Sequence, residues 1–267
     1  MKYVDLHMHT IYSDGTLMPE DNVRNAAMLG TQVVAITDHD STKGYQRALK
    51  EGQEWDVKVL SGVEITTPKF HILGYNFDVE NRSFQELLTY SRECQANIVR
   101  QKIEILKDQG VPITFEKLYN RFPESRLGTG NLTMTLVLDK ECRKYNGELT
   151  YLDAYYKYLG NGTLAKTVEC PKVTAKDAIS GIHQAGGIAI VAHPFKQVSS
   201  PKELSDLIKL EINGLEIQPN YSGKNKPFKE FAKEQGLIIT YGSDYHGPLY
   251  LDRPLLQRNG NLSHFFK

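Results

Sequence analysis

The 267-residue sequence has only three cysteines, Cys94, Cys142 and Cys170, and no two of them form a C-x-x-C pair. Such sparse cysteines exclude a disulfide framework and a zinc–thiolate site, so we expect all three to be reduced and without function. The sequence also lacks any apolar run of about 18 residues, and its first residues lead into a strand pattern without an apolar signal-peptide core. We therefore expect a cytoplasmic protein.

An excess of charge is also absent, because 32 Lys and Arg balance 32 Asp and Glu. No global basic field then attracts long nucleic acid or an anionic membrane, so any phosphate must be bound locally. We expect no membrane and no obligatory protein partner. With 40% hydrophobic and 24% charged residues, the composition is that of an ordinary globular protein.

Short β-branched runs alternate with helical patterns, which is typical of a parallel α/β sheet or barrel. Helix signals punctuate the pattern: Pro19 and Gly30 bracket one helix, another is predicted over residues 174–185, and Ser200 to Glu203 form a capping box. The seven predicted strands cover residues 3–7, 33–37, 58–65, 70–75, 188–192, 214–217 and 237–241.

The rhythm changes between residues 81 and 170, where a long helical pattern over 84–109 leads into aromatic-rich helical sequence without clear strands. We therefore predict a helical insertion subdomain at residues 79–170 and an α/β barrel formed by residues 1–78 and 171–267. Five tyrosines of the insertion are predicted to pack in its interior and not to stack on a base. They are Tyr145, Tyr151, Tyr155, Tyr156 and Tyr158.

Six of the eight histidines lie on or just beyond predicted strands, at the strand ends where barrel enzymes carry their functional residues. His7 and His9 end the first strand, and their two-residue spacing puts both side chains on one face. Two imidazoles can thus share one ion. His183, inside a helix, and His264, in the C-terminal tail, are expected not to be ligands.

Carboxylates fall at the same strand ends. Asp14 lies in a Ser-Asp-Gly loop, and Asp38-His39-Asp40 follow the second strand. Glu64 interrupts an apolar strand, where a carboxylate is costly to bury unless it is paired or bound to metal. Later strands add four more candidate ligands, namely His71, His193, Asp244 and His246.

Imidazole and carboxylate ligands without cysteine suit Zn²⁺, Mn²⁺ or Fe²⁺, whereas an all-oxygen set would suit Mg²⁺ or Ca²⁺. Two ions about 3.5–4 Å apart activate a bridging water and stabilise both the attacking and the leaving oxygen of a phosphoester. Neither a Ser-His-Asp or Cys-His arrangement nor a G-x-x-x-x-G-K-[ST] phosphate loop competes. We predict a phosphoesterase with two or three divalent ions.

These segments resemble the PHP (polymerase and histidinol phosphatase) family, whose motifs occur here in family order over about two-thirds of the chain. The motifs are D-L-H-M-H-T, S-D-G, I-T-D-H-D, G-V-E-I, H-I-L-G, A-H-P and G-S-D-Y-H-G. Within the family the chain is similar to stand-alone bacterial nucleotide phosphatases and short-RNA 5′ exonucleases, which carry a helical insertion between H-I-L-G and A-H-P. The resemblance implies a distorted (β/α)7 barrel.

The resemblance also implies three metal positions and hydrolysis of a phosphomonoester by a metal-bridging hydroxide. The substrate would be a nucleotide, another small phosphorylated compound or the 5′ end of short RNA. Asp38 and Asp40 would orient ligating imidazoles, and the general acid would be Asp14, His193, His246 or metal-bound water. The implied ligands are His7, His9, Glu64 and Asp244 for the first ion, Glu64, His71 and His193 for the second, and Asp14, His39 and His246 for the third.

Cations near the barrel mouth are expected to bind the substrate phosphate, first Lys196 and then Arg126, Lys224 and Lys226. Many relatives show Gly-Arg-Pro-His at the start of an insertion helix, where this chain reads Gly-Thr-Gly-Asn at residues 128–131. Either Arg126 or a lysine replaces the missing arginine and histidine, or the protein handles a different phosphorylated compound.

Three other functions compete. Metal-dependent amidohydrolases also begin with H-x-H but typically end in a lone aspartate, whereas this chain ends in Asp244-Tyr245-His246. A histidinol phosphate phosphatase would share fold and metals, although the insertion argues mildly against it. A PHP module that binds metal without catalysis usually lacks ligands, and none of the nine is missing here.

Overall fold

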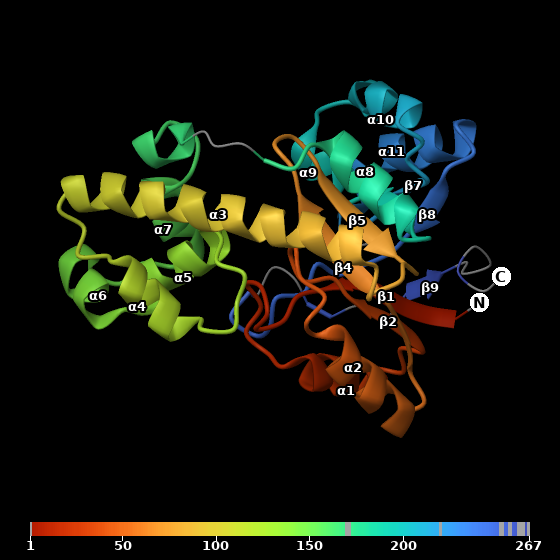
Figure 1. Cartoon of the computed structure of the whole chain (residues 1–267), viewed down its shortest axis with the longest axis horizontal. Coiled ribbons are helices and arrows are strands. Elements are labelled where there is room, and N and C mark those ends of the chain that lie inside the picture. The colour runs from red at the N-terminus through yellow and green to blue at the C-terminus, as the bar shows by residue number, and fades with distance from the viewer. Residues whose placement is uncertain are drawn as a thin grey trace. The chain divides into compact units, whose positions relative to one another are not determined.

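The computed structural model describes residues 2–168, 172–218, 221–250, 254–255, 258–260 and 265. The chain divides into two compact units, one formed by Met1–Thr89 with Val173–Lys267 and the other by Tyr90–Lys172. Among the described residues, all strands belong to the first unit and the second is helical (Figure 1). Helix α3 (Arg82–Asp108) begins in the first unit and continues through the second.

The described strands form two sheets, so the fold is mixed α/β and not a single parallel sheet. The order is β3-β2-β1-β9 in one sheet and β4-β5-β6-β7-β8 in the other. The pairs β1–β9, β4–β5 and β5–β6 are antiparallel. The strands are β1 (Lys2–Met8), β2 (Val33–Ile36), β3 (Lys58–Leu60), β4 (Gly62–Thr66), β5 (His71–Tyr75), β6 (Ile188–Val191), β7 (Gly214–Glu216), β8 (Ile238–Thr240) and β9 (Arg258–Gly260).

The prediction of parallel neighbours is wrong for β4 and β5, because residues 67–70 alone connect them and a parallel crossover needs a dozen or more residues. The predicted strand over 58–65 is also wrong, since the chain leaves one sheet and enters the other at Ser61. The Ser61 hydroxyl donates to the carbonyl of Phe77 at 2.9 Å. Next to it, a Cβ on Gly62 would lie 2.6 Å from the carbonyl oxygen of Ile36, so only glycine fits there.

The other six predicted strands are confirmed to within one residue at each end, whereas β9 is absent from the prediction.

Hydrogen bonds join the two sheets where their strands end. The Leu6 amide donates to the carbonyl of Tyr241 at 3.0 Å, and parallel bridges pair Met8 with Tyr245 and His39 with Glu64. The ends of β1, β2 and β4 therefore meet in one place.

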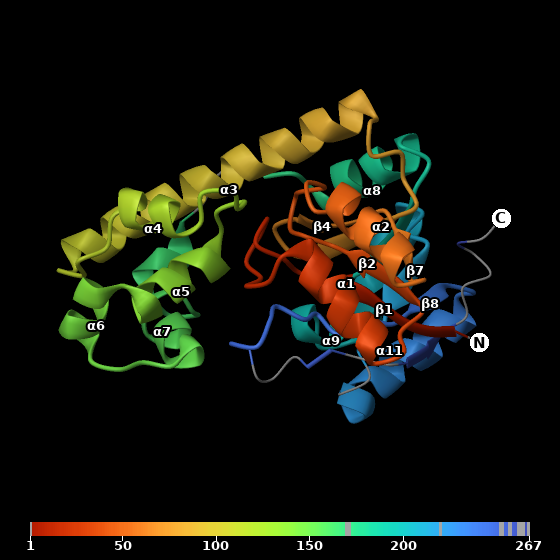
Figure 2. The same cartoon turned by 90° about the horizontal axis from the view of Figure 1, so that it is seen from below.

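Apolar residues fill the space between the strands and their covering helices. Ala178, Ile179 and Ile182 form the buried face of α8, which packs on β5 and β6 (Figure 1). Helices α1 and α2 lie side by side against β2 and β3 (Figure 2). The helices of this unit are α1 (Pro19–Met28), α2 (Tyr45–Glu54), α8 (Ala175–Gln184), α9 (Pro194–Gln197), α10 (Ser205–Lys209) and α11 (Ser222–Glu234), with a 3₁₀ turn η2 (Pro201–Leu204).

The helix signals in the sequence are confirmed. Pro19 opens α1 and Gly30 follows it with a φ of 79°. Thr174 and Asp177 form a capping box at the start of α8, and the Ser200 box opens the short turn η2. None of the helices in the described part of the chain combines the length and apolar character needed to cross a membrane.

The second unit has its own core, in which Ile103, Leu106 and Leu132 are buried together. The predicted long helix is confirmed as α3, but the tyrosine prediction is wrong for Tyr145 and Tyr156, which are 52% and 67% exposed. Cys142 and Cys94 are unpaired and buried, and Cys170 lies outside the described residues. The remaining helices are α4 (Phe115–Arg121), α5 (Thr129–Leu138), α6 (Lys140–Asn146) and α7 (Tyr151–Tyr158), followed by a 3₁₀ turn η1 (Leu164–Thr167).

Lys102 on α3 is a buried cation that costs stability. Its residue is 7% exposed, and burial together with the positive charges of Lys166, Lys172 and Arg126 lowers its pKa from 10.5 to about 8. Below pH 8 both the folded and the unfolded chain are protonated there, so the full cost is present. Between pH 8 and 10.5 only the unfolded chain keeps the proton, and the cost fades as pH rises.

We therefore expect Lys102→Met to stabilise the protein by about 2 kcal/mol at pH 7 in phosphate-free buffer, with no gain above about pH 10.5. Urea unfolding across this pH range measures the difference between variant and wild type. Lys107→Met is the matched control, because Lys107 lies on the same helix, is exposed and pairs with Glu104 at 2.9 Å. A loss of stability in Lys102→Met at pH 7 would contradict the assignment.

Candidate metal centre

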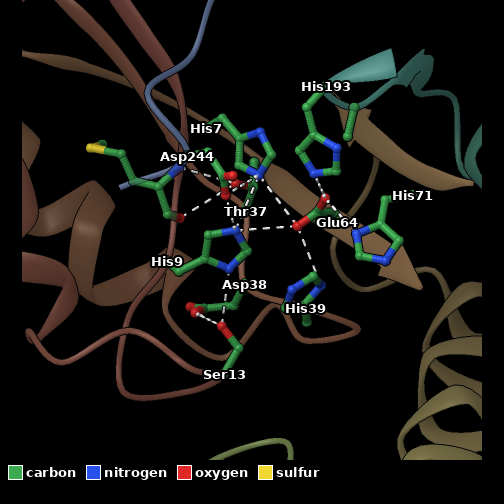
Figure 3. Close-up of polar contacts among 12 residues, drawn as sticks. His7, His9, Ser13, Thr37, Asp38, His39, Glu64, His71, His193 and Asp244 are labelled. Carbon is green, nitrogen blue, oxygen red and sulfur yellow. Dashed lines mark hydrogen bonds and ion pairs between the residues drawn. The ribbon is translucent and has the colours of Figure 1, made fainter. Parts of the chain in front are cut away.

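The Glu64 carboxylate is the hub of a cluster of histidines. It is 1% exposed on β4, and imidazole rings face both of its oxygens (Figure 3). The shortest distances join Oε1 to His71 Nδ1 and to His193 Nε2, each at 3.0 Å. The Oε2 atom lies 3.3 Å from His7 Nε2, 3.2 Å from His9 Nε2 and 3.3 Å from His39 Nδ1.

The end of β1 supplies the two closest imidazoles. His7 and His9 project from one face of the strand, as their spacing predicts, and their Nε2 atoms are 3.1 Å apart. The His7 Nδ1 atom faces Glu216 Oε1 at 2.8 Å and carries the proton of that hydrogen bond. With this proton on Nδ1, neutral His7 would offer its Nε2 lone pair to a cation bound beside Glu64 and His9, as a metal-ligating imidazole does.

Two aspartates and His246 extend the cluster. Asp244 Oδ1 lies 3.5 Å from the Nε2 atoms of both His7 and His9. Asp14 Oδ1 lies 3.3 Å from His246 Nε2, is buried, and accepts no hydrogen bond from a described residue. His246 Nδ1 donates to the Asp244 carbonyl at 2.7 Å, so the Nε2 lone pair points toward Asp14. A buried carboxylate oxygen without a donor fits a cation.

All nine predicted ligands lie in four overlapping groups, and within each group the possible ligand atoms are within 4.8 Å of one another. Because the donors mix imidazole nitrogen and carboxylate oxygen, they fit a borderline divalent cation. The groups are His9, Asp14, His39 and His246; His7, Glu64 and His193; His7, His9 and Asp244; and His39, Glu64 and His71.

The opposed charges hold the carboxylates ionised. Burial alone would raise the pKa of Glu64, but the neighbouring imidazoles outweigh it and hold that pKa well below its ordinary value. The same balance lowers the pKa of Asp14, chiefly through His246 and His39. For His7, burial acts to lower the pKa, but the carboxylates of Glu216, Glu64 and Asp244 raise it. Ionised carboxylates are the form that binds cations.

Three residues of the centre have a left-handed backbone, with φ of 50° at Asp40, 26° at His193 and 59° at Asp244. Such positions cost about 1–3 kcal/mol each and persist where neighbouring contacts hold them. At His193 the amide donates to Glu216 Oε2 at 2.8 Å, and at Asp40 it donates to the Glu64 carbonyl at 2.9 Å. The fold therefore holds these three residues in strained backbone conformations that orient their side chains.

The hydrogen bonds of His193 place its proton on Nε2. The Gln197 amide oxygen accepts from the His71 amide at 3.1 Å, so its nitrogen must face His193 Nδ1, at 2.9 Å. Since Gln197 donates to Nδ1, the ring proton is on Nε2 and points at Glu64 Oε1. In this arrangement the Nε2 atom of His193 carries a proton and offers no lone pair, whereas the proton of neutral His7 is on Nδ1.

Asp38 and Asp40 support the imidazoles through intermediate residues. Asp38 accepts from the Ser13 hydroxyl at 2.6 Å, and Ser13 lies 3.2 Å from His9 Nδ1 (Figure 3). Asp40 accepts from the Thr66 amide at 2.9 Å, and the Thr66 hydroxyl lies 3.3 Å from His39 Nδ1. Both aspartates therefore fix ring orientations at one remove.

Glu216 is the supporting residue that the sequence analysis missed. It is fully buried on β7, with one oxygen on the His7 ring and the other on the His193 amide. A signal was present, because Leu215-Glu216-Ile217 repeats the pattern of a carboxylate within an apolar strand seen at Glu64. Gly242 makes room, since a Cβ there would lie 2.5 Å from Glu216 Oε1.

We expect Glu216→Gln to weaken metal binding by roughly 10–100-fold, because the amide neither accepts from His7 as strongly nor raises its basicity. Titration of the metal-free variant with Mn²⁺, followed by calorimetry, measures the change. Glu211→Gln is a matched control on an exposed residue. Unchanged affinity in Glu216→Gln would show that the His7 contact does not tune the ligand.

The predicted phosphate-binding cations lie in three different places. Lys196 reaches the cluster, with Nζ 2.9 Å from Asp244 Oδ2. Lys224 and Lys226 are exposed on α11, where Lys226 lies 4.0 Å from Glu230, and neither contacts a predicted ligand in the described structure. Arg126 belongs to the helical unit.

Of the two histidines predicted not to be ligands, only His183 belongs to the described residues. His183 lies on α8, and its Nε2 atom faces Asn213 Oδ1 at 2.8 Å. His264 lies outside the described residues.

A profile of the PHP domain matches residues 5–158, more than half of the chain and most of the predicted ligands. The chain belongs to the PHP domain family. A protein of Bifidobacterium adolescentis assigned as a metal-dependent phosphoesterase has the same fold, with a TM-score of 0.83 and 25% identity over 96% of this chain and 91% of that one. The predicted family is thereby confirmed.

Three relatives indicate the range of activities. A 5′–3′ exoribonuclease of Salmonella typhimurium is 30% identical, over 91% of this chain and 85% of its own. A phosphoribosyl 1,2-cyclic phosphate 1,2-diphosphodiesterase of Eggerthella lenta is 28% identical, over 91% and 94%. A 3′,5′-nucleoside bisphosphate phosphatase of Chromobacterium violaceum is 26% identical, over 93% and 88%. All three names describe hydrolysis of phosphate esters.

Proposed function

We propose that this PHP domain protein is a metal-dependent phosphoesterase acting on a nucleotide, another small phosphorylated compound or the 5′ end of short RNA. The observation that carries the proposal is the buried Glu64 carboxylate with five imidazole nitrogens within 3.3 Å of its oxygens. So dense a group of ligand atoms is costly to bury unless cations bind between them. The names of the relatives support the same chemistry.

Two or three ions of Zn²⁺, Mn²⁺ or Fe²⁺ fit the donor set. The proposed ligands are His7, His9, Glu64 and Asp244 for the first ion, Glu64, His71 and His193 for the second, and Asp14, His39 and His246 for the third. When bound, the ions would activate water and neutralise charge on the phosphoryl group. The sequence pattern and the family resemblance further support a distorted (β/α)7 barrel with a helical insertion at residues 79–170. They also support a cytoplasmic location.

Two further roles fall to side chains of the centre: binding of the substrate phosphate and donation to the leaving group. Lys196 would move from Asp244 to a phosphate oxygen, because both are anions and the lysine lies at the edge of the cluster. Asp14, His193 and His246 are the candidate proton donors to the leaving group. Of these we favour His193 as the hydrogen-bond donor to the leaving oxygen, because Gln197 fixes an N–H on Nε2 and burial lowers the imidazolium pKa of His193, which keeps the ring neutral. His193 has either this role or that of a ligand to the second ion, because Nε2 cannot carry a proton and bind a metal at once; the metal content of a His193 variant separates the two roles.

Phosphate release from a panel of esters tests the proposal. Mn²⁺-loaded protein is supplied with 5′-AMP, 3′,5′-bisphosphorylated adenosine, histidinol phosphate and a short 5′-phosphorylated RNA, beside His9→Ala. We expect turnover only with the intact centre, and preference for one of the nucleotide esters. Preference for histidinol phosphate would replace the proposed substrate, and no turnover of any ester would identify a metal-binding module without catalysis.

A further inference from the structure

We propose that an ordered water molecule is bound at the carboxyl ends of β7 and β8, where it positions the Glu216 carboxylate on the His7 ring. Its protein ligands are Gln218, Thr240 and Asn225, each only 2% exposed. Together these residues contain four of the eight buried side-chain nitrogen and oxygen atoms that have no hydrogen-bond partner in the described part of the chain. Such atoms are rare and costly in a folded protein, so their concentration in one place indicates a bound ligand.

Strand pairing and hydrogen bonds bring the three residues together. Thr240 pairs with Glu216 on the neighbouring parallel strand, and its carbonyl accepts from the Ile217 amide at 2.9 Å. Gln218 follows Glu216 by two residues, so both Gln218 and Thr240 lie on the face that carries Glu216. Asn225 is in the first turn of α11, which packs on both strands (Figure 1), and its side-chain amide donates to the Gln218 carbonyl.

The unpaired groups require a ligand that both donates and accepts hydrogen bonds. Neither side-chain atom of Gln218 has a partner among the described residues, so one NH₂ and one oxygen are unpaired whichever way the amide is turned. Asn225 uses its NH₂ on the Gln218 carbonyl, which leaves its oxygen as an acceptor. The Thr240 hydroxyl can do either. A bare cation would leave the NH₂ unpaired, whereas water serves donors and acceptors alike.

Glu216 can accept a further hydrogen bond from this water. Its Oε1 atom faces His7 Nδ1 at 2.8 Å, and its Oε2 atom accepts from the His193 amide at 2.8 Å. Each carboxylate oxygen can accept two hydrogen bonds, so a water held by Gln218 and Thr240 can donate to either one. The water then fixes the carboxylate, and through it the His7 ring. This positioning role rests on the proposed metal centre, whereas the water itself does not.

Crystal structures of the metal-loaded protein test the ligand, with either sodium or thallium(I) as the monovalent cation of the crystallisation solution. We expect electron density for one water within hydrogen-bond distance of the Gln218 amide and the Thr240 hydroxyl, without an anomalous signal at that position in the thallium crystals. An anomalous peak there would identify a monovalent cation and overturn the proposal, and an absence of density would also overturn it. This result does not depend on whether the protein hydrolyses phosphate esters.

Thr240→Val tests the positioning role, because valine keeps the shape of threonine and removes the hydroxyl. We expect a lower urea midpoint and an affinity for Mn²⁺ weakened by roughly three- to tenfold, the effect of one lost hydrogen bond. Thr240→Ser restores the hydroxyl and should recover most of the Mn²⁺ affinity, although the missing methyl group keeps its urea midpoint low. A merely structural role for Thr240 would not give this separation.

Thr135→Val is the matched control, because the buried Thr135 hydroxyl donates to the Asn131 carbonyl at 2.9 Å within the helical unit. It should lose stability and keep its affinity for Mn²⁺. A raised urea midpoint in Thr240→Val would show that the hydroxyl has no partner, and an unchanged Mn²⁺ affinity would show that the water does not act on Glu216. Either result would overturn the proposal.

Discussion

Glu64→Gln is expected to abolish phosphate release, with a loss on the order of 10³-fold or more. The substitution keeps the size of the side chain but removes the negative charge that faces five imidazoles. Two proposed metal positions share this carboxylate, so both should empty together. Metal content after dialysis, measured by mass spectrometry beside phosphate release, checks both effects on one sample.

Glu86→Gln is the control for this substitution, because Glu86 is 65% exposed on α3 and pairs only with Arg82 in the described structure. It should retain both metal and activity. A Glu64→Gln protein that keeps its full metal content would show that Glu64 does not bridge the ions. If Glu64→Gln retained both its metal and its activity, the Glu64 carboxylate with its five imidazoles would no longer support the proposed function.

His193→Gln is expected to lower kcat by about 10²–10³-fold for esters with poor leaving groups. The reason is the N–H that Gln197 fixes on His193 Nε2, beside Glu64, which would donate a hydrogen bond to the leaving oxygen. p-Nitrophenolate leaves without needing that hydrogen bond, so hydrolysis of a p-nitrophenyl ester should fall much less. The comparison of the two substrates, with metal content measured in parallel, separates a hydrogen-bond donor to the leaving oxygen from a metal ligand.

His183→Gln serves as the matched control, since His183 lies on α8 and contacts Asn213. It should behave as wild type with both esters. Equal losses for the two esters in His193→Gln, accompanied by loss of metal, would instead assign His193 as a ligand through Nε2. Such a result would require Gln197 or the ring to reorient on metal binding, and it would leave Asp14 and His246 as the candidate acids.

The supporting residues explain why the centre was only partly predictable. Glu64 and Glu216 have the same local signature, a carboxylate between apolar residues of a strand. Nothing local distinguishes a carboxylate that faces five imidazoles from one that holds a single ring and a backbone amide. Only the pairing of β7 beside β6, which brings Glu216 to His193, makes that difference.

The sequence by itself indicated the family, six of the strands and the nine candidate ligands, because most of these ligands lie in or next to an apolar run and strand alternation is a local property. Tertiary structure alone decided that 58–65 is two strands, that β4 and β5 are antiparallel and that His193 carries its proton on Nε2. Tertiary structure also decided that Lys102 is buried near other cations, whereas Lys107, another lysine of α3, is exposed. These features depend on contacts between residues far apart in the chain, which local patterns do not record.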